Sequence, residues 1–410
     1  MEEEEELSRR VGEMKLGQNH AAWDVLQPLC MFGLLALGIT TIYSAQLSFG
    51  GGQWKAQLAW AALSLGLYVV VSRIDYESYL RQAHWIYLVS LGLLLLLWTP
   101  LGVRRFGALR WLRLGPLRFQ PSELAKAAAL FLVASILARS DIGKLRHSWP
   151  TLLKIAAVSF LPMLLIFLQP DLGSALALPP MVFALLFLSP LSGKFFLSVL
   201  GFALLFLSVV TWDVYAYRLY LDEHHLNPLR DMGQYEARSY LPLKDYQRNR
   251  ILAFVSPQVV DPQGTGISWN LRQSLMAIGC GGWKGRGFCR GKQSNLGYLP
   301  PSVATNDFIF SVLAEEWGLL GGLLLLLLYG LLLADALHIA ALARDSFGAF
   351  VAVGTAVLWM MHIGINIGMT LGLMPITGIP LPFVSYGGSF LLLSCFLQGV
   401  VQSIYHYRFR

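Results

Sequence analysis

About ten long apolar segments fill most of this sequence, and they constrain the fold more than any other feature. Each is close to the roughly 20 residues that a helix needs to cross a bilayer. The chain is 55% hydrophobic and 13% charged, whereas soluble domains carry about 25% charged residues. We therefore predict an all-α, polytopic integral membrane protein with about ten transmembrane helices. The segments cover approximately residues 24–45, 54–72, 83–100, 121–138, 151–168, 173–190, 194–213, 307–334, 347–371 and 381–403.

The hydrophilic parts of the chain define its organisation. The start, MEEEEEL, is acidic, whereas a signal peptide begins with positive charge. Residues 1–22 are therefore expected to form an acidic cytoplasmic tail, ahead of a single membrane domain over 23–406. The longest polar stretch, 214–306, is predicted to be an extracytoplasmic loop between the seventh and eighth helices.

The basic residues indicate a topology and a ligand. With a cytoplasmic N-terminus, segments 73–81 and 139–146 and the C-terminal arginines lie inside, as the positive-inside rule requires. Segments 101–120 and 214–306 then lie outside although both are rich in arginine. Guanidinium groups bind phosphates in bidentate fashion. We therefore expect these outer arginines to bind an anionic amphiphile, such as a lipid pyrophosphate, and expect no nucleic acid partner. The arginines of the first outer segment are Arg104, Arg105, Arg110, Arg113 and Arg118.

Charged residues also occur inside the apolar segments. Glu123 and Lys126 are three apart at the start of the fourth helix, so they share a face and can pair. Such charges usually face a protein interior or a watery cavity. Asp171 precedes the sixth helix, where it can act as an N-cap or face a ligand. His362 and Asn366 share a face of the ninth helix and are interpreted as packing contacts between helices.

The outer loop carries two glycine-rich stretches. In the first, Asp261 opens the string DPQGTG, whose residue types favour a turn. The second, 279–287, has neither the spacing nor the strand of a nucleotide-binding motif. Its amides can form an anion nest beside Lys284. Cys280 and Cys289 lie in the same loop, and a disulfide between them is left open.

Between the last two predicted helices, residues 375–389 are rich in proline and glycine. Such a stretch at membrane depth must be buried in protein or line a cavity. The residues alone thus indicate a membrane protein with an outward-facing cationic cavity. They do not separate a transporter from an enzyme.

The order of several short motifs resembles the SEDS family of shape, elongation, division and sporulation proteins. The resemblance extends from about residue 24 to 405. Within the family, the sequence is most similar to the elongation branch, and the division branch is the close alternative. One departure is the run 299–306, which lacks the usual Glu and His before the retained Asp307. The matching strings are GALRW at 107–111, QPSELAK at 120–126, QPDLG at 169–173, DPQGTG at 261–266, DFIF at 307–310 and PLPFVSYGGS at 380–389.

The resemblance implies a peptidoglycan glycosyltransferase in the bacterial cytoplasmic membrane, with both termini in the cytoplasm. It implies that the substrate is lipid II, that polyprenyl diphosphate is released, and that the partners are a class B penicillin-binding transpeptidase and other elongation-complex membrane proteins. A lipid II flippase and a docking scaffold are the alternatives from other functional classes. Both are less compatible with polar motifs that cluster on the outer side.

The resemblance also implies residue roles. Polymerisation needs a base for the acceptor hydroxyl and positive charge for the departing diphosphate. Asp261 is expected to be the catalytic base. A divalent cation, Mg²⁺ or Mn²⁺, can assist, but the sequence shows no dedicated metal cage. The expected substrate-binding residues are Arg110, Glu123, Lys126, Asp171, Arg250, Lys284 and Ser385.

Overall fold

The fold is built from long apolar helices. The computed structural model describes residues 23–409 apart from 106–107, 116, 144 and 240, so the predicted acidic tail lies outside the described residues. Within this part, 8 helices are long and apolar enough to cross a membrane. The helical membrane fold is therefore confirmed. These helices are α2 (Leu26–Gln46, continued by the 3-10 turn η1, Leu47–Phe49), α3 (Gln53–Ser72), α5 (Pro121–Ala138), α6 (Leu145–Leu168), α9 (Gly193–Glu223), α15 (Ile309–Leu342), α16 (Ser346–Thr370) and α17 (Gly388–His406).

The two other predicted crossings have different outcomes. Segment 83–100 corresponds to α4 (Glu77–Leu96), a helix of 20 residues. Segment 173–190 corresponds to two shorter helices, α7 (Leu172–Leu176) and α8 (Leu178–Phe187), which meet at Ala177. The total of ten crossings therefore stays a prediction.

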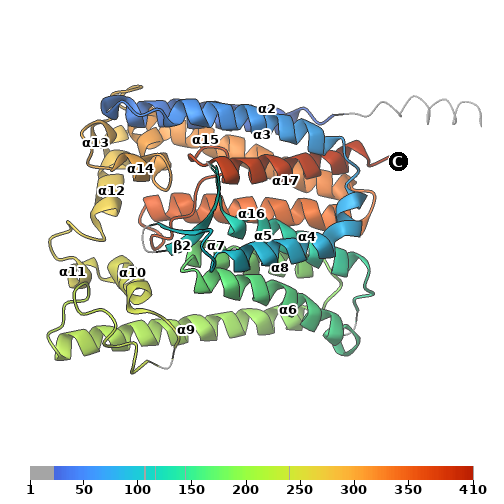
Figure 1. Cartoon of the computed structure of the whole chain (residues 1–410), viewed down its shortest axis with the longest axis horizontal. Coiled ribbons are helices and arrows are strands. Elements are labelled where there is room, and N and C mark those ends of the chain that lie inside the picture. The colour runs from blue at the N-terminus through green and yellow to red at the C-terminus, as the bar shows by residue number, and fades with distance from the viewer. Residues whose placement is uncertain (1–22, 106–107, 116, 144, 240, 410) are drawn as a thin grey trace, which may run out of the picture.

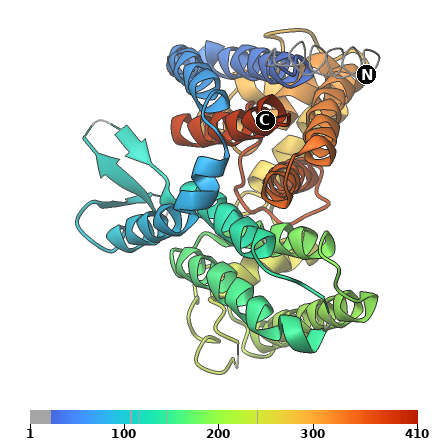
Figure 2. The ribbon, with the colours of Figure 1, turned by 90° about the vertical axis from the view of Figure 1, so that its right-hand side faces the viewer.

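The long helices run roughly side by side in one bundle (Figures 1 and 2). α17 packs chiefly on α3, and α15 packs on α2 and α16. α5 lies against α4, α6 and α16, and 83% of its most apolar stretch is buried. α9 is the opposite case, because none of its most apolar stretch is buried within the described chain. Such a surface is suited to contact with lipid.

The short helices of the outer loop gather at one end of the bundle, whereas the start of α2 and the C-terminus lie at the other end (Figure 1). We call the end with the short helices the outer end. It holds most of the predicted loop 214–306, although α9 extends ten residues further than the predicted 213. The short helices are α10 (Asp245–Val255), α11 (Pro257–Val260), α12 (Trp269–Gly281), α13 (Lys292–Asn295) and α14 (Pro301–Ala304).

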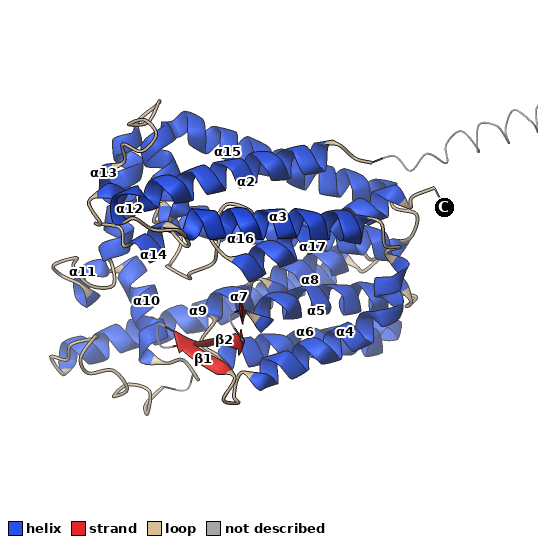
Figure 3. Cartoon of the chain, turned by 45° about the horizontal axis from the view of Figure 1, so that its top comes forward, coloured by secondary structure: helices blue, strands red, loops and turns tan. Residues whose placement is uncertain are grey.

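A small antiparallel sheet forms where only an outer loop was expected. It has the order β1-β2-β3, and Figure 3 shows strands beside the helices near α5 and α6. Val103 pairs with Trp111 and Leu112 with Phe119, and the register shifts between Val103 and Arg104. The strands are β1 (Gly102–Arg105), β2 (Ala108–Leu114) and β3 (Leu117–Phe119).

The proline- and glycine-rich segment before α17 is buried in protein. α17 begins at Gly388, later than the predicted 381, so the segment between α16 and α17 is irregular. Asn366 Nδ2 donates to Ile379 O at 2.7 Å, and the Tyr329 hydroxyl donates to Pro382 O. Backbone carbonyls that no helix satisfies thus receive side-chain donors, as the membrane interior requires.

Candidate active site

Arg110 is singled out from the other outer arginines by the pleat of β2. Successive strand residues point to opposite faces, so Arg110 shares a face with buried Leu112, whereas Arg113 is exposed opposite Arg118. The Arg110 Nη2 group donates to Pro170 O, and its Nη1 lies 3.6 Å from Asp171 Oδ1. Its Nε–H is buried without an acceptor in the described part of the chain. Arg110 is therefore held at the bundle with one donor unused.

Asp171 anchors this arginine from the start of α7. It is the N-cap residue and is 3% exposed. Its Oδ2 accepts from Ser174 Oγ at 2.9 Å and from Gln120 Nε2 at 3.2 Å. The capping role is therefore confirmed, and the role near a ligand stays a prediction. Because its oxygens are already bonded, Asp171 is suited to position Arg110.

Arg250 approaches the same region from α10. The neighbouring Arg248 is fully buried and fixes this helix, since its Nε lies 2.8 Å from Asp213 Oδ2 of α9 and its Nη1 lies 3.0 Å from Asp245 Oδ1. The Arg250 guanidinium stacks on Tyr246 at 5.9 Å but has no hydrogen bond or ion pair in the described chain. Burial and the nearby positive charge of Arg110 lower the pKa of Arg250. Two mutually repelling cations with unused donors favour a bound anion.

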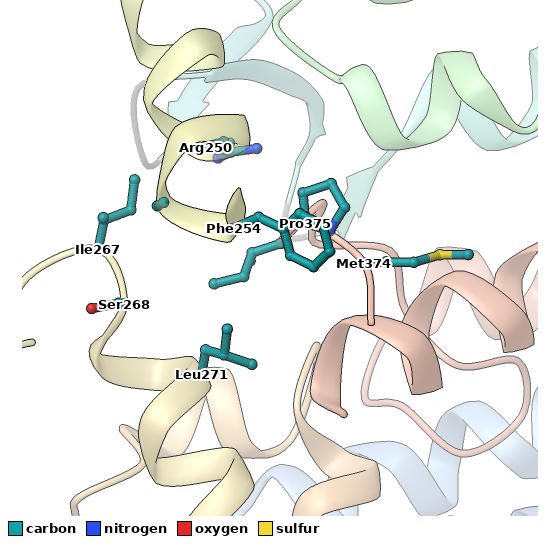
Figure 4. Close-up of a pocket in the computed structure, with 9 residues that line it drawn as sticks. Arg250, Phe254, Ile267, Ser268, Leu271, Met374 and Pro375 are labelled. Atoms are coloured by element: carbon teal, nitrogen blue, oxygen red, sulfur yellow. The ribbon is translucent and has the colours of Figure 1, made fainter. Parts of the chain in front are cut away.

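A largely apolar pocket adjoins Arg250. Figure 4 shows Arg250 and Phe254 of α10 on one side and Met374 and Pro375, which follow α16, on the other. Ser268 also lines this pocket and bonds to Asp261. The pocket therefore joins the cationic cluster to the Asp261 turn. It places apolar walls beside the Arg250 guanidinium, an arrangement that suits an anionic amphiphile.

Asp307 completes the charged cluster, and sequence reasoning noted it only as a retained motif residue. It lies between α14 and α15, outside the membrane-spanning helix. Its carboxylate makes no hydrogen bond or ion pair within 4.0 Å among the described residues. Burial, with a smaller effect from the negative Asp171, raises the pKa of Asp307 to about 6, although Arg110 and Arg250 act to lower it. The DFIF string was the signal that could have marked this residue.

The predicted pair in α5 is present and has a third member. Lys126 Nζ lies 2.9 Å from Glu123 Oε2 and 2.9 Å from His362 Nε2. His362 Nδ1 lies 3.2 Å from Pro380 O. These partners assign a neutral ring whose Nδ1–H donates to Pro380 and whose Nε2 accepts from Lys126. His362 thus joins α16 to α5 through Lys126, as the predicted contact between helices requires.

Asp261 is enclosed by its own turn. Thr265 N donates to Oδ1 at 3.1 Å. Oδ2 accepts from Gly266 N at 2.9 Å, from Ser268 N at 3.1 Å and from Ser268 Oγ at 2.6 Å. Burial alone would raise the pKa of Asp261, but these donors together lower it. The carboxylate therefore stays ionised at neutral pH and shapes the loop beside the Arg250 pocket.

The amides at the end of the glycine-rich run are used by the protein itself. Arg286 N donates to the Glu315 carbonyl oxygen at 2.9 Å, and Gly287 N donates to the Glu316 carbonyl oxygen at 3.0 Å. Gly285 packs against the Glu316 backbone, where a Cβ would lie 2.0 Å from the carbonyl oxygen. The expectation of a free anion nest at 279–287 is therefore wrong. This run fastens the outer loop to α15.

Two other predicted residues lie apart from the cationic cluster. Lys284 is exposed and makes no polar contact with a described residue. The Ser385 hydroxyl donates to Asn306 O at 2.7 Å and accepts from Leu381 N at 2.8 Å. Ser385 thus holds its loop against the segment that leads to Asp307. Substrate contact by either residue stays a prediction. All four cysteines are free, so Cys280 and Cys289 do not form a disulfide.

A metal centre was also considered. Within the described residues, no group of three or more His, Cys, Asp and Glu side chains is arranged to hold a metal ion. Asp171 and Asp261 direct their oxygens to protein donors. The residues present therefore do not form a dedicated cation cage.

Comparison with known proteins identifies the family. The model of the FtsW/RodA/SpoVE family, described as cell cycle proteins, matches residues 20–409. The peptidoglycan glycosyltransferase MrdB of Escherichia coli K12 is 36% identical over 394 residues, covering 94% of this chain and 95% of the relative. The peptidoglycan glycosyltransferase RodA of Treponema pallidum is 32% identical and covers 93% of this chain and 97% of the relative.

A solved structure has the same fold. It is described as structural coordination of polymerization and crosslinking by a peptidoglycan synthase complex. The match has a TM-score of 0.72 at 30% identity and covers 94% of this chain and 98% of the other. This chain therefore belongs to the FtsW/RodA/SpoVE family, the SEDS family that its motifs indicate.

Proposed function

We propose that this protein is a peptidoglycan glycosyltransferase of the RodA type, which polymerises lipid II during cell elongation. The observation that carries the proposal is the pair of outer-end arginines, Arg110 and Arg250, beside an apolar pocket. Such a site matches a ligand with a diphosphate head and a lipid tail. Relatives named peptidoglycan glycosyltransferase, at 36% and 32% identity over nearly the whole chain, support the same activity.

The reaction places two demands on the site. A new glycosidic bond forms when the acceptor hydroxyl attacks the anomeric carbon of the donor, and the polyprenyl diphosphate leaves. Arg110 and Arg250 stabilise the negative charge that develops on the diphosphate. Asp171 orients Arg110, and Glu123 with His362 orients Lys126, which adds a third cation to the wall of the site.

Asp261 is the proposed base for the acceptor hydroxyl. Its lowered pKa keeps it ionised and able to accept a proton. A low pKa also makes it a weak base, so its action depends on exact placement of the hydroxyl by the surrounding turn. A divalent cation is proposed only as a companion of the bound diphosphate, since no protein cage for it is present among the described residues.

The proposed setting follows from the same resemblance. The protein is an integral membrane protein, and we place it in the bacterial cytoplasmic membrane with both termini inside. A class B penicillin-binding transpeptidase is the proposed partner. A solved structure of similar fold, described as a peptidoglycan synthase complex that coordinates polymerization and crosslinking, supports this partner.

An assay in proteoliposomes separates polymerase from flippase. Fluorescent lipid II is supplied to vesicles that contain the purified full-length protein, with and without the transpeptidase. A polymerase produces glycan chains that resist extraction with the lipid. Redistribution of unreacted lipid II between leaflets, without glycan, would instead establish the flippase. Imaging then distinguishes the branches of the family, because lateral-wall signal indicates elongation and a midcell ring indicates division.

A further inference from the structure

Asp307 is held rigidly by its backbone while its side chain is left without a partner. Its carbonyl oxygen accepts from Asn366 Nδ2 at 3.0 Å. The two preceding carbonyls accept from the segment before α17, Thr305 O from Tyr386 N at 2.9 Å and Asn306 O from Ser385 Oγ at 2.7 Å. The side chain lies against Gly378, where a Cβ would be 3.4 Å from Asp307 Oδ2. Three bonded carbonyls in succession thus fix the backbone that carries this carboxyl group.

The charged groups that face Asp307 come from three separate elements. Arg110 belongs to β2, Arg250 to α10, and Asp171 precedes α7, and all three act electrostatically on Asp307. Asp171 is the carboxylate that pairs with Arg110. Asp307 has no ion pair with either arginine within the described chain. Asp307 therefore does not serve to hold an arginine in place.

Unused polar groups surround the same place. The Arg110 Nε–H is buried without an acceptor, and the Arg250 guanidinium has no hydrogen-bonding partner in the part of the chain that the structure describes. A diphosphate between these groups would satisfy both donors. An ionised Asp307 would repel that diphosphate. A protonated Asp307 would instead donate a hydrogen bond to it.

We propose that Asp307 acts as a carboxylic acid in the diphosphate subsite, donating its proton to the oxygen of the departing diphosphate. This inference rests on the proposed function and adds a second catalytic carboxyl group to Asp261. The two carboxyl groups lie in opposite environments. Hydrogen bonds lower the pKa of Asp261, whereas desolvation raises the pKa of the half-buried Asp307. Such divergence is typical of a base and an acid that serve one reaction.

The proposed step is balanced. The bond between the anomeric carbon and the diphosphate oxygen breaks, and its electron pair remains on that oxygen. The acceptor hydroxyl oxygen forms the new bond to the carbon and releases its proton to Asp261. The proton of Asp307 passes to the diphosphate oxygen. After product release, Asp307 takes a proton from water and Asp261 returns one.

Binding of a diphosphate probe across pH tests the proposal without catalysis. The full-length protein in detergent is titrated with farnesyl diphosphate between pH 6 and 8. The free carboxyl group has a pKa of about 6, and the negative probe favours the protonated form, so rising pH must weaken binding. One linked proton changes the dissociation constant of the probe by up to about tenfold per pH unit. Ionisation of the probe itself has the opposite sign, because a more negative probe binds arginines better.

Two variants sharpen the experiment. Asp307→Asn keeps a neutral hydrogen-bond donor, so its binding should be at least as tight as that of the wild type at pH 8 and should not weaken as pH rises. It has no proton to transfer, so polymerisation from lipid II should fall by roughly 10²-fold or more. Asp222→Asn is the matched control, because Asp222 is an exposed aspartate at the outer end of α9. It should behave like the wild type.

Two results would overturn the proposal. One is an Asp307→Asn protein whose affinity for the probe changes between pH 6 and 8 as that of the wild type does, because both proteins share the effect of probe ionisation. The other is undiminished polymerisation by Asp307→Asn. Failure of the wild type to bind the probe and to form glycan would instead refute the proposed function itself.

Discussion

Lys126 Nζ lies 2.9 Å from His362 Nε2, which joins α5 to α16 through a contact between residues 236 positions apart. Both side chains are almost fully buried. The Lys126 ammonium therefore depends on Glu123 and His362 for its solvation. This arrangement fixes where the third cation of the proposed active site can point.

The contact predicts a coupled effect of mutations. His362→Phe removes one acceptor from a buried ammonium group, which should cost about 1–3 kcal/mol of stability. Combined with Lys126→Met, the same change should cost much less, because no ammonium remains to be solvated. Thermal unfolding of the four proteins in detergent measures this coupling. Strictly additive losses would show that the contact is not energetically significant.

The Glu123–Lys126 pair predicts a separation of stability from activity. Lys126→Met leaves a buried carboxylate unpaired, and breaking a buried pair costs about 3–5 kcal/mol. Adding Glu123→Gln should restore much of the thermal stability but not glycan formation, since the cation is still missing. Recovery of both properties in the double variant would make the pair purely structural.

The strand register predicts that two neighbouring arginines differ. Arg110 contacts Asp171 and faces the bundle, whereas Arg113 is exposed. Arg110→Ala should reduce lipid II turnover by at least about tenfold, the effect of losing roughly 1.4 kcal/mol of transition-state stabilisation. Arg113→Ala should change it less than about twofold. Equal effects of the two substitutions would favour contact with lipid head groups over diphosphate binding.

The proposed topology can be tested with a native thiol. Cys280 is free and exposed in the outer loop, whereas Cys30 and Cys395 are buried. A membrane-impermeant maleimide should label Cys280 of a Cys289→Ser protein in intact spheroplasts, and a protein with both Cys280 and Cys289 replaced by serine gives the background. A cysteine placed at exposed Gly143 in that background should react only after permeabilisation. Labelling of both positions from the same side would contradict the topology.

Contacts between residues that are close in the sequence were predicted better than contacts between distant segments of the chain. The i, i+3 spacing of Glu123 and Lys126 gave their pair directly. The segment 101–120 was predicted only as a loop, because arginines on both faces of β2 obscure the alternation that marks a strand.

Long-range contacts explain the remaining differences. The partner of Lys126 lies on another helix, and amides of the glycine-rich run that was expected to hold an external anion donate to backbone carbonyls of α15. Neither neighbour follows from local sequence. The environment of Asp307 also depends on long-range contacts, because β2, α10 and the residues before α7 create it.

The hydrogen bonds of the Asp261 turn determine what an asparagine variant would remove. An N–H group points at each carboxylate oxygen, so the amide of Asn must face one of these donors. Asp261→Asn therefore loses at least one hydrogen bond of the loop as well as the base. Ser268→Ala is the matched control, because it removes one donor to the same carboxylate and keeps the charge.

The most direct test of the account is the amount of glycan that the purified full-length protein makes from lipid II in the presence of the proposed transpeptidase partner. The wild type should form chains, and Ser268→Ala should retain most of that activity. Asp261→Asn should lose roughly 10²–10⁴ in rate, the usual cost of losing a general base. Absence of glycan from the wild type, or near-normal polymerisation by a folded Asp261→Asn protein, would contradict the account.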